Sequence, residues 1–139
     1  MNSCIFCEIV KGECESSRVH EDAFSIGFMA LEPVNPGHVL LMPKAHYEDM
    51  FLAPQEEIAR LLPVANAIAT ALKRIYQAPR VVLVAAGLVV PHAHWHIAPI
   101  YTPHDITSRA ELEGMLKLAA RSELDAIAAD IRAAMVLPG

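Results

Sequence analysis

The sequence predicts an α+β fold in which an antiparallel sheet packs against helices on one face. Short apolar runs typical of strands come first, a long stretch with helical spacing follows, and two more strand-like runs precede a helical end of the chain. The chain has 139 residues, of which 54% are hydrophobic. That size and composition suit one compact domain with a buried core, so residues 1–139 are expected to form a single domain.

Two short strands are expected near the start of the chain. Residues 19–22 (VHED) and 23–30 (AFSIGFMA) have strand character, and Glu21 with Asp22 supplies the turn between them. Apolar residues recur at every second position of the longer run, which predicts one buried face: Phe24, Ile26 and Phe28.

The middle of the chain predicts a central strand and the longest helix. Residues 31–37 hold two prolines and a glycine, typical of an irregular connection, and the apolar run 38–43 (HVLLMP) predicts a central strand. Pro54 followed by Gln-Glu-Glu is a helix start signal, with Pro54 at the first helical position, and helical spacing continues to about Tyr76. Pro63 should kink or restart this helix, because proline lacks an N–H donor.

A hairpin is expected next. Residues 80–84 and 89–98 have strand character on either side of a turn at 85–88. Gly87 gives this turn the backbone freedom that it needs.

Helical spacing returns from Ser108 onward. Ser108 and Glu111 match a capping box, and Ser122 is expected to cap a second helical segment. Each segment has an apolar stripe, formed by Leu112, Met115, Leu116 and Ala119 in the first and by Leu124, Ile127, Ala128, Ile131 and Met135 in the second.

Three histidines stand at alternate positions in the second strand of the predicted hairpin. Because side chains of a strand alternate between its faces, His92, His94 and His96 should point one way, about 6.5 to 7 Å apart per step. A single histidine of this kind is usually a satisfied core residue, but three in register indicate a functional site. The intervening residues should face the core: Ala93, Trp95 and Ile97.

Such a row has two chemical uses. Two of its rings can converge on one zinc ion, with a further ligand from elsewhere in the chain. Alternatively, one ring attacks a substrate while its neighbours orient it and protonate the leaving group.

Charge and segment composition exclude several classes of partner. The formal charge of −5 argues against a nucleic acid or an anionic membrane as partner, while a small phosphorylated ligand needs only local donors. The sequence shows neither a signal-peptide pattern at its start nor an apolar run of about 18 residues. A cytoplasmic protein is therefore expected.

Two of the three cysteines form a CxxC pair. In a cytoplasmic chain, three cysteines point away from disulfides, and Cys14 is interpreted as an ordinary small residue. A redox pair is expected at the start of a helix after a strand, whereas Cys4 and Cys7 stand at the very start of the sequence. Zinc is therefore favoured over redox chemistry or chance, and a structural site then needs two histidines from elsewhere.

Residues 91–99 (PHAHWHIAP) resemble the His-x-His-x-His signature of the histidine triad superfamily, whose members hydrolyse or transfer nucleotides. The resemblance implies a five-stranded antiparallel sheet and a homodimer that acts on a small nucleotide-like substrate. Further matches extend along the chain: Cys4-Ile5-Phe6-Cys7 with Ile9 and Lys11-Gly12-Glu13, Pro36-Gly37-His38, Pro43-Lys44-Ala45-His46, and Ala86-Gly87.

The resemblance also implies roles for the three histidines. His94 corresponds to the nucleophile, which attacks the α-phosphorus of a nucleotide ester or phosphoramidate and forms a phosphohistidine that water resolves. His96 would contact the leaving group and donate to it, and His92 would orient the site from the zinc.

Ligands of the metal and of the nucleotide follow from the same resemblance. It selects His46 and His92 as the ligands that complete a structural zinc site with Cys4 and Cys7. The residues implied to bind the nucleotide are apolar or small: Ile5, Phe6, Ile9, Phe28, Leu31 and Gly87.

Three positions depart from the family pattern. Ala30 replaces an acidic residue that holds the ribose hydroxyls, Val81 replaces an Asn on the phosphate side, and Leu88 replaces a Gln after the turn glycine. Each lost hydrogen bond costs about 1 to 3 kcal/mol, so affinity for ordinary nucleotides should be weak.

These observations leave three hypotheses. The first is a histidine triad hydrolase or transferase with an altered substrate preference, acting through phosphohistidine. The second is a binding or regulatory protein that keeps the fold and a structural zinc. The third is a metal-bound triad that activates a hydrolytic water.

Overall fold

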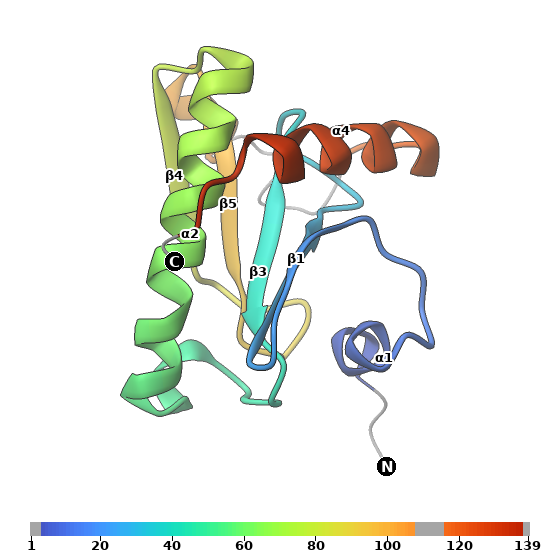
Figure 1. Cartoon of the computed structure of the whole chain (residues 1–139), viewed down its shortest axis with the longest axis vertical. Helices are drawn as coiled ribbons and strands as arrows, with labels where there is room; N and C mark the ends of the chain where they lie inside the picture. The colour runs from blue at the N-terminus through green and yellow to red at the C-terminus, as the bar shows by residue number, and fades with distance from the viewer. Residues whose placement is uncertain (1–3, 108–115, 138–139) are drawn as a thin grey trace.

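The computed structural model describes residues 4–107 and 116–137 and confirms the α+β fold (Figure 1). In this part of the chain, five strands form one sheet in the order β1-β2-β3-β5-β4, and each pair of neighbours is antiparallel. The strands are β1 (Arg18–Glu21), β2 (Ser25–Met29), β3 (Val39–Pro43), β4 (Arg80–Val84) and β5 (Trp95–Ile100). The helices are α1 (Ile5–Lys11), α2 (Gln55–Tyr76) and α4 (Arg121–Ala134), with short 3₁₀ turns η1 (Met50–Leu52) and η2 (Pro103–Asp105).

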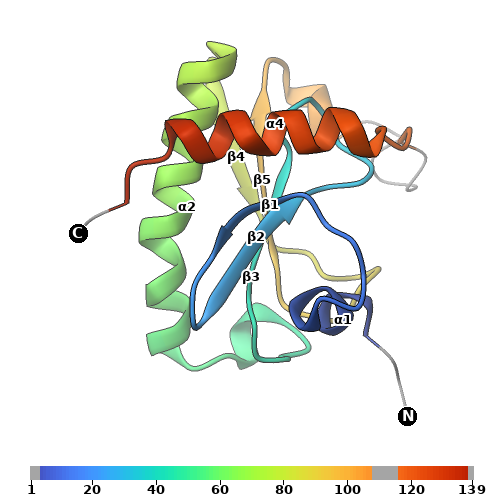
Figure 2. The same ribbon diagram turned by 45° about the vertical axis from the view of Figure 1, so that its right-hand side comes forward.

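The two long helices cover one face of the sheet, as predicted, and the short helix α1 covers part of the other. Figures 1 and 2 both show α2 and α4 close together and α1 away from them. Buried residues of α2 and α4 form one cluster with sheet residues that include Leu41, Trp95 and Ile97. Phe6 and Ile9 of α1 form a second cluster with sheet residues on the opposite face: Ile26, Phe28, Ala30, Leu40 and Met42.

Helix α2 continues through Pro63, so the expected restart does not occur. The missing N–H of Pro63 leaves the carbonyl of Ala59 without its helical partner, and both residues are exposed, so water can satisfy that carbonyl. Pro54 is the N-cap residue of α2, whereas the prediction made it the first helical residue. Acidic residues in the first turn and basic residues in the last complement the helix dipole.

The turn of the first hairpin covers residues 22–24, whereas the prediction placed it at Glu21 and Asp22. Glu21 ends β1, and the carboxylate of Asp22 accepts hydrogen bonds from the N–H groups of Phe24 and Ser25, which starts β2. Phe24 is 50% exposed beside the guanidinium of Arg60, so the predicted burial of this residue is wrong. The whole of β2 is buried because helices cover both of its faces.

The second strand of the predicted hairpin is shorter than expected. β5 begins at Trp95, so residues 89–94 lie outside the sheet, and His96 is the only triad histidine in a strand. The chain turns tightly at Pro91, where the N–H of His92 donates to the carbonyl of Val90 at 2.8 Å. The last pair between β4 and β5 is Val84 with His96.

The C-terminal prediction is correct in part. Residues 108–115, with the predicted capping box, lie outside the described residues, and residues 116–120 are not helical. Helix α4 begins at Arg121 with Ala120 as its N-cap, so Ser122 is inside the helix. The predicted stripe is buried at Leu124, Ala128 and Ile131.

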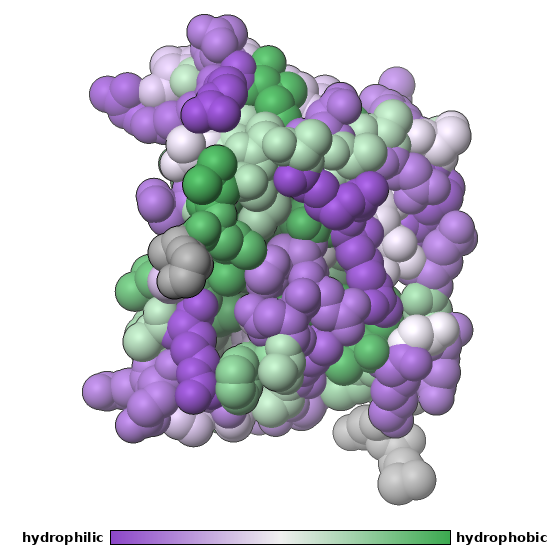
Figure 3. Space-filling model, viewed as in Figure 1, coloured by the Kyte–Doolittle hydropathy of each residue, from purple (hydrophilic) through white to green (hydrophobic). Residues whose placement is uncertain are grey.

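The surface seen in Figure 3 mixes hydrophilic residues with several separate groups of hydrophobic ones, as is usual for a water-exposed face. Among the described helices, none combines the length and the apolar character that crossing a membrane requires.

Candidate active site and metal-ligand group

The three triad histidines lie on the α1 side of the sheet, in a segment that enters β5. The residues between them point to the opposite core, as predicted, since Ala93, Trp95 and Ile97 belong to the cluster with α2 and α4. The ring centroids of His94 and His96 are 4.9 Å apart, closer than a regular strand predicts. His94 precedes β5, which begins at Trp95, so its backbone does not follow the regular spacing of the strand. The two rings can therefore face one small ligand together.

A main-chain carbonyl fixes the protonation pattern of His94. Its Nδ1–H donates to the carbonyl of His92 at 2.6 Å, so Nε2 carries the lone pair. Burial lowers the pKa of His94 below its ordinary value, although this hydrogen bond acts in the opposite direction. At neutral pH His94 is therefore a neutral imidazole with Nε2 able to attack.

A fourth histidine, His38, orients His96. The N–H of Val34 donates to His38 Nδ1 at 3.1 Å, which leaves the proton of neutral His38 on Nε2. That Nε2–H then donates to His96 Nδ1 at 2.9 Å, and the proton of His96 must lie on its own Nε2. His96 thus presents an N–H donor where His94 presents a lone pair.

Burial keeps this pair neutral. Burial lowers the pKa of His38 to about 3, with further lowering from nearby His96 and His94, and it lowers the pKa of His96 to about 4. In the sequence, His38 begins the predicted central strand and ends the family-like segment Pro36-Gly37-His38, but neither pattern places it beside His96. The pairing register of β3 with β5 places it there: Leu40 pairs with His96, and His38, two positions before Leu40, therefore lies beside the triad.

Cys4, Cys7, His46 and His92 form a compact group of potential metal ligands, whose donor atoms all lie within 4.8 Å of one another. The Nδ1 atoms of His46 and His92 are 3.1 Å apart, and three sulfur-to-nitrogen distances, from Cys4 to His92 and from Cys7 to His46 and His92, are 3.3 to 3.5 Å. A tetrahedral zinc site with bonds of about 2.0 Å to nitrogen and 2.3 Å to sulfur needs edges of about 3.3 Å between two nitrogens, about 3.5 Å between nitrogen and sulfur, and about 3.8 Å between two sulfurs. The group therefore fits zinc in both chemistry and spacing.

His92 connects the metal-ligand group to the triad. Its Nε2–H donates to the carbonyl of Pro43 at 3.0 Å, so Nδ1 faces the cysteines without a proton, as a metal ligand requires. The ring is completely buried, and burial lowers its pKa. The carbonyl of the same residue accepts the hydrogen bond from His94.

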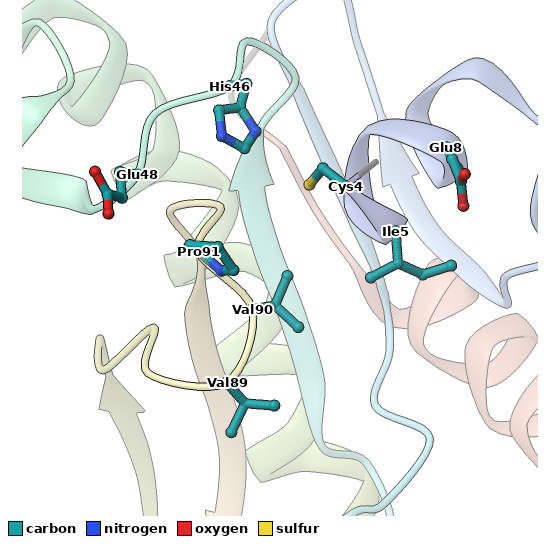
Figure 4. A pocket seen from close by; sticks show the side chains of 8 residues that line it. All are labelled: Cys4, Ile5, Glu8, His46, Glu48, Val89, Val90 and Pro91. Carbon is teal, nitrogen blue, oxygen red and sulfur yellow. The ribbon is translucent and has the colours of Figure 1, made fainter. Parts of the chain in front are cut away.

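Two cavities flank this arrangement. Figure 4 shows the larger one, of 690 Å³, between α1 and the segment before the triad, with Ile5 and Cys4 on one side and Val89, Val90 and Pro91 on the other. The smaller one, of 170 Å³, lies beside His94 and is lined in addition by Asp49, Met50, Phe51, Ala85, Ala86, Gly87 and Ala93. Within residues 4–107 and 116–137, no lysine or arginine lines either cavity.

The residues expected to bind a nucleotide occupy three environments. Phe6, Ile9 and Phe28 are buried together, and the ring of Phe6 packs edge-on against His94 at a centroid distance of 5.0 Å. Ile5 is 44% exposed in the larger cavity, and Gly87 lines the smaller one with a positive φ of 69°. Leu31 is half exposed and lines neither cavity.

The three departures from the family pattern occupy different environments. Leu88 is 93% exposed in the loop before the triad, and Ala30 is buried in the cluster with Phe6. Val81 packs against the core on the α2 side of the sheet, so the expectation that it lines a phosphate is wrong.

Comparisons with known proteins agree with this architecture. A family model described as the HIT domain matches residues 11–102. The adenosine 5'-monophosphoramidase of Schizosaccharomyces pombe is 35% identical over 98 residues, covering 70% of this chain and 74% of that protein. A HIT-like protein structure from Bartonella henselae aligns with a TM-score of 0.81 and 28% identity over 97% of this chain and 98% of that one. A Zn-bound histidine triad family protein from Mycobacterium smegmatis aligns with a TM-score of 0.75 and 27% identity over 95% of this chain and 92% of that one. The chain therefore belongs to the HIT domain family.

Proposed function

We propose that this protein is a nucleotidyl hydrolase or transferase in which His94 is the nucleophile. The observation that carries the proposal is the hydrogen bond from His94 Nδ1–H to the His92 carbonyl, which leaves a buried and neutral Nε2 lone pair beside a donor on His96. The adenosine 5'-monophosphoramidase relative supports a phosphoramidate or phosphoester of a nucleotide as the substrate class.

The reaction has two steps. His94 Nε2 forms a bond to phosphorus while the bond from phosphorus to the leaving nitrogen or oxygen breaks, giving a phosphohistidine and a leaving group that carries the electron pair. His96 Nε2 gives its proton to that leaving atom. The carbonyl of His92 stabilises the positive charge that His94 gains. Water then attacks phosphorus and returns a proton to His96 Nε2, the electron pair of the breaking bond goes back to His94 Nε2, and the free nucleotide is released.

The walls of the site favour a substrate with a single phosphoryl group. Among the residues that the structure describes, neither lining holds a lysine or an arginine, so these walls offer no cation to a polyphosphate, and Glu8, Glu48 and Asp49 add negative charge around the cavities. Leu88 and Val89 are exposed apolar residues in the loop before the triad. The family resemblance implies a hydrogen-bonding Gln at the position of Leu88. We therefore propose that the substrate preference of this protein differs from that of a hydrolase that acts on ordinary nucleotides.

A structural zinc ion belongs to the same proposal. Cys4, Cys7, His46 and His92 would hold it, and four protein ligands leave no open position for a metal-bound water. Only one triad histidine is in this group, which weighs against the third hypothesis of a triad that holds a catalytic metal. When bound, zinc would stabilise the fold around His92. We further propose that the protein is a cytoplasmic homodimer, as its family resemblance implies.

The decisive experiment is to trap phosphohistidine and compare two variants. His94→Ala should abolish both the intermediate and the hydrolysis of adenosine 5'-phosphoramidates, because it removes the covalent route. His96→Ala should slow hydrolysis by about 10²- to 10⁴-fold, with a greater loss for leaving amines that need more assistance. His104→Ala is the matched control, because His104 is exposed in η2, outside the triad segment.

Two outcomes would contradict the proposal. Hydrolysis that survives in His94→Ala would exclude this nucleophile. A wild-type protein that binds nucleotides but forms no phosphohistidine would favour the alternative of a binding or regulatory protein with a structural zinc.

A further inference from the structure

Helix α1 touches both the metal-ligand group and the proposed nucleophile. Cys4 caps the helix and Cys7 follows in its first turn, so both sulfur ligands belong to this element. Phe6 stands between them and is buried against the rings of His94, His92 and Phe28, at centroid distances of 5.0, 6.0 and 5.5 Å.

The other contacts that hold α1 are few. The helix has seven residues, and helices of this length are unstable alone. Beyond the packing of Phe6 and Ile9, a guanidinium N–H of Arg18 donates to the carbonyl of Ile9 at the opposite end from the cysteines, at 2.7 Å. At the cysteine end, the sulfur contacts with His46 and His92 add to the packing of Phe6.

We infer that the metal-ligand group is a latch that fastens α1 and thereby seats Phe6 against the ring of His94. The hydrogen bond to the His92 carbonyl restrains one edge of that ring, and the edge-to-face contact with Phe6 restrains its plane, at an interplanar angle of 86°. Phe6 is thus a positioning residue for the nucleophile, and the two cysteines act on catalysis through it. The inference rests on the proposed role of His94.

Hydrogen exchange tests the latch without any measurement of activity. Removal of zinc by a chelator, or the Cys4→Ser/Cys7→Ser variant, should speed exchange of the Glu8 and Gly12 amides, which are hydrogen-bonded in α1, by about 10-fold or more. The central strand amide of Leu41 should be unaffected and serves as the internal reference. Equal protection of α1 with and without the metal would overturn the latch.

Single-turnover formation of phosphohistidine from an adenosine 5'-phosphoramidate tests the connection through Phe6. Phe6→Ala should slow this step by up to about 10²-fold, the scale for a reacting group that is poorly placed, and Phe6→Leu should recover most of the rate because it keeps apolar volume there. Adding Phe6→Ala to Cys4→Ser/Cys7→Ser should cost little more than either change alone.

Losses that multiply in the combined variant would overturn the pathway through Phe6, and so would an unchanged rate in Phe6→Ala. If no phosphohistidine forms at His94 in the wild type, the proposed function fails and the positioning role fails with it. The exchange data would then still decide whether the metal holds α1, so the two failures are distinguishable.

Discussion

Replacing His38 by leucine tests the tautomer argument most directly. The change removes the donor to His96 Nδ1 and the acceptor for the Val34 N–H; His38 itself is buried, and both hydrogen bonds are partly buried. Two unsatisfied groups at about 1 to 3 kcal/mol each, offset in part by the apolar side chain, predict a loss of about 2 to 4 kcal/mol in unfolding free energy. Denaturant unfolding would measure that loss.

The same change should reduce catalysis more than stability alone explains. Without the His38 proton at Nδ1, His96 loses the hydrogen bond that keeps its own proton on Nε2. A bias of about 1 kcal/mol corresponds to a tautomer ratio of about five, and displacement of the ring adds to it, so the rate with a phosphoramidate should fall by about 10- to 100-fold. The assay is the single-turnover rate at a temperature where the variant is fully folded.

His38→Gln is the matched variant for this prediction. Its amide N–H can donate to His96 Nδ1, so its rate should lie within a few-fold of the wild type. Full activity in folded His38→Leu would refute the orientation of His96 by His38. Equal damage from leucine and glutamine would also refute it, because donation would then be irrelevant.

Three further predictions follow from the site. Metal analysis of the purified protein should find about one zinc per chain. The Cys4→Ser/Cys7→Ser variant should lose the zinc and some stability, whereas the control variant Cys14→Ser should keep both. An unchanged zinc content in the double variant would exclude the ligand set. Leu88→Gln should tighten AMP binding in titration calorimetry at little cost to stability, since the residue is 93% exposed, whereas Ala30→Asp should destabilise the fold by about 3 kcal/mol because it buries an unpaired carboxylate. Unchanged AMP affinity in Leu88→Gln would show that this position does not face the ligand. The free energy of unfolding should be highest above pH 6.5 and should fall as the pH falls. Burial lowers the pKa of His38 to about 3 and that of His96 to about 4, so below pH 6.5 the unfolded chain binds more protons than the folded one. Each of these two histidines should cost about 2 kcal/mol at pH 5, and an unfolding free energy that stays constant between pH 6.5 and 5 would contradict this.

The sequence by itself determined the elements whose signals are local. Apolar spacing predicted α2 and the buried stripe of α4, and the run before Pro43 predicted β3 within one residue. The alternation around the triad correctly separated the core-facing residues from the histidines. These predictions succeed because helix and strand periodicities depend on neighbours only two to four positions apart.

Only the tertiary structure decided the contacts that join distant segments. Cys4 meets His92 across 88 positions, and His38 meets His96 across 58 positions through the pairing of β3 with β5. Family resemblance implied the first contact, but nothing in the local pattern indicated the second. Register and packing fix such pairs, because a shift of one residue in a strand would turn His96 to the other face of the sheet.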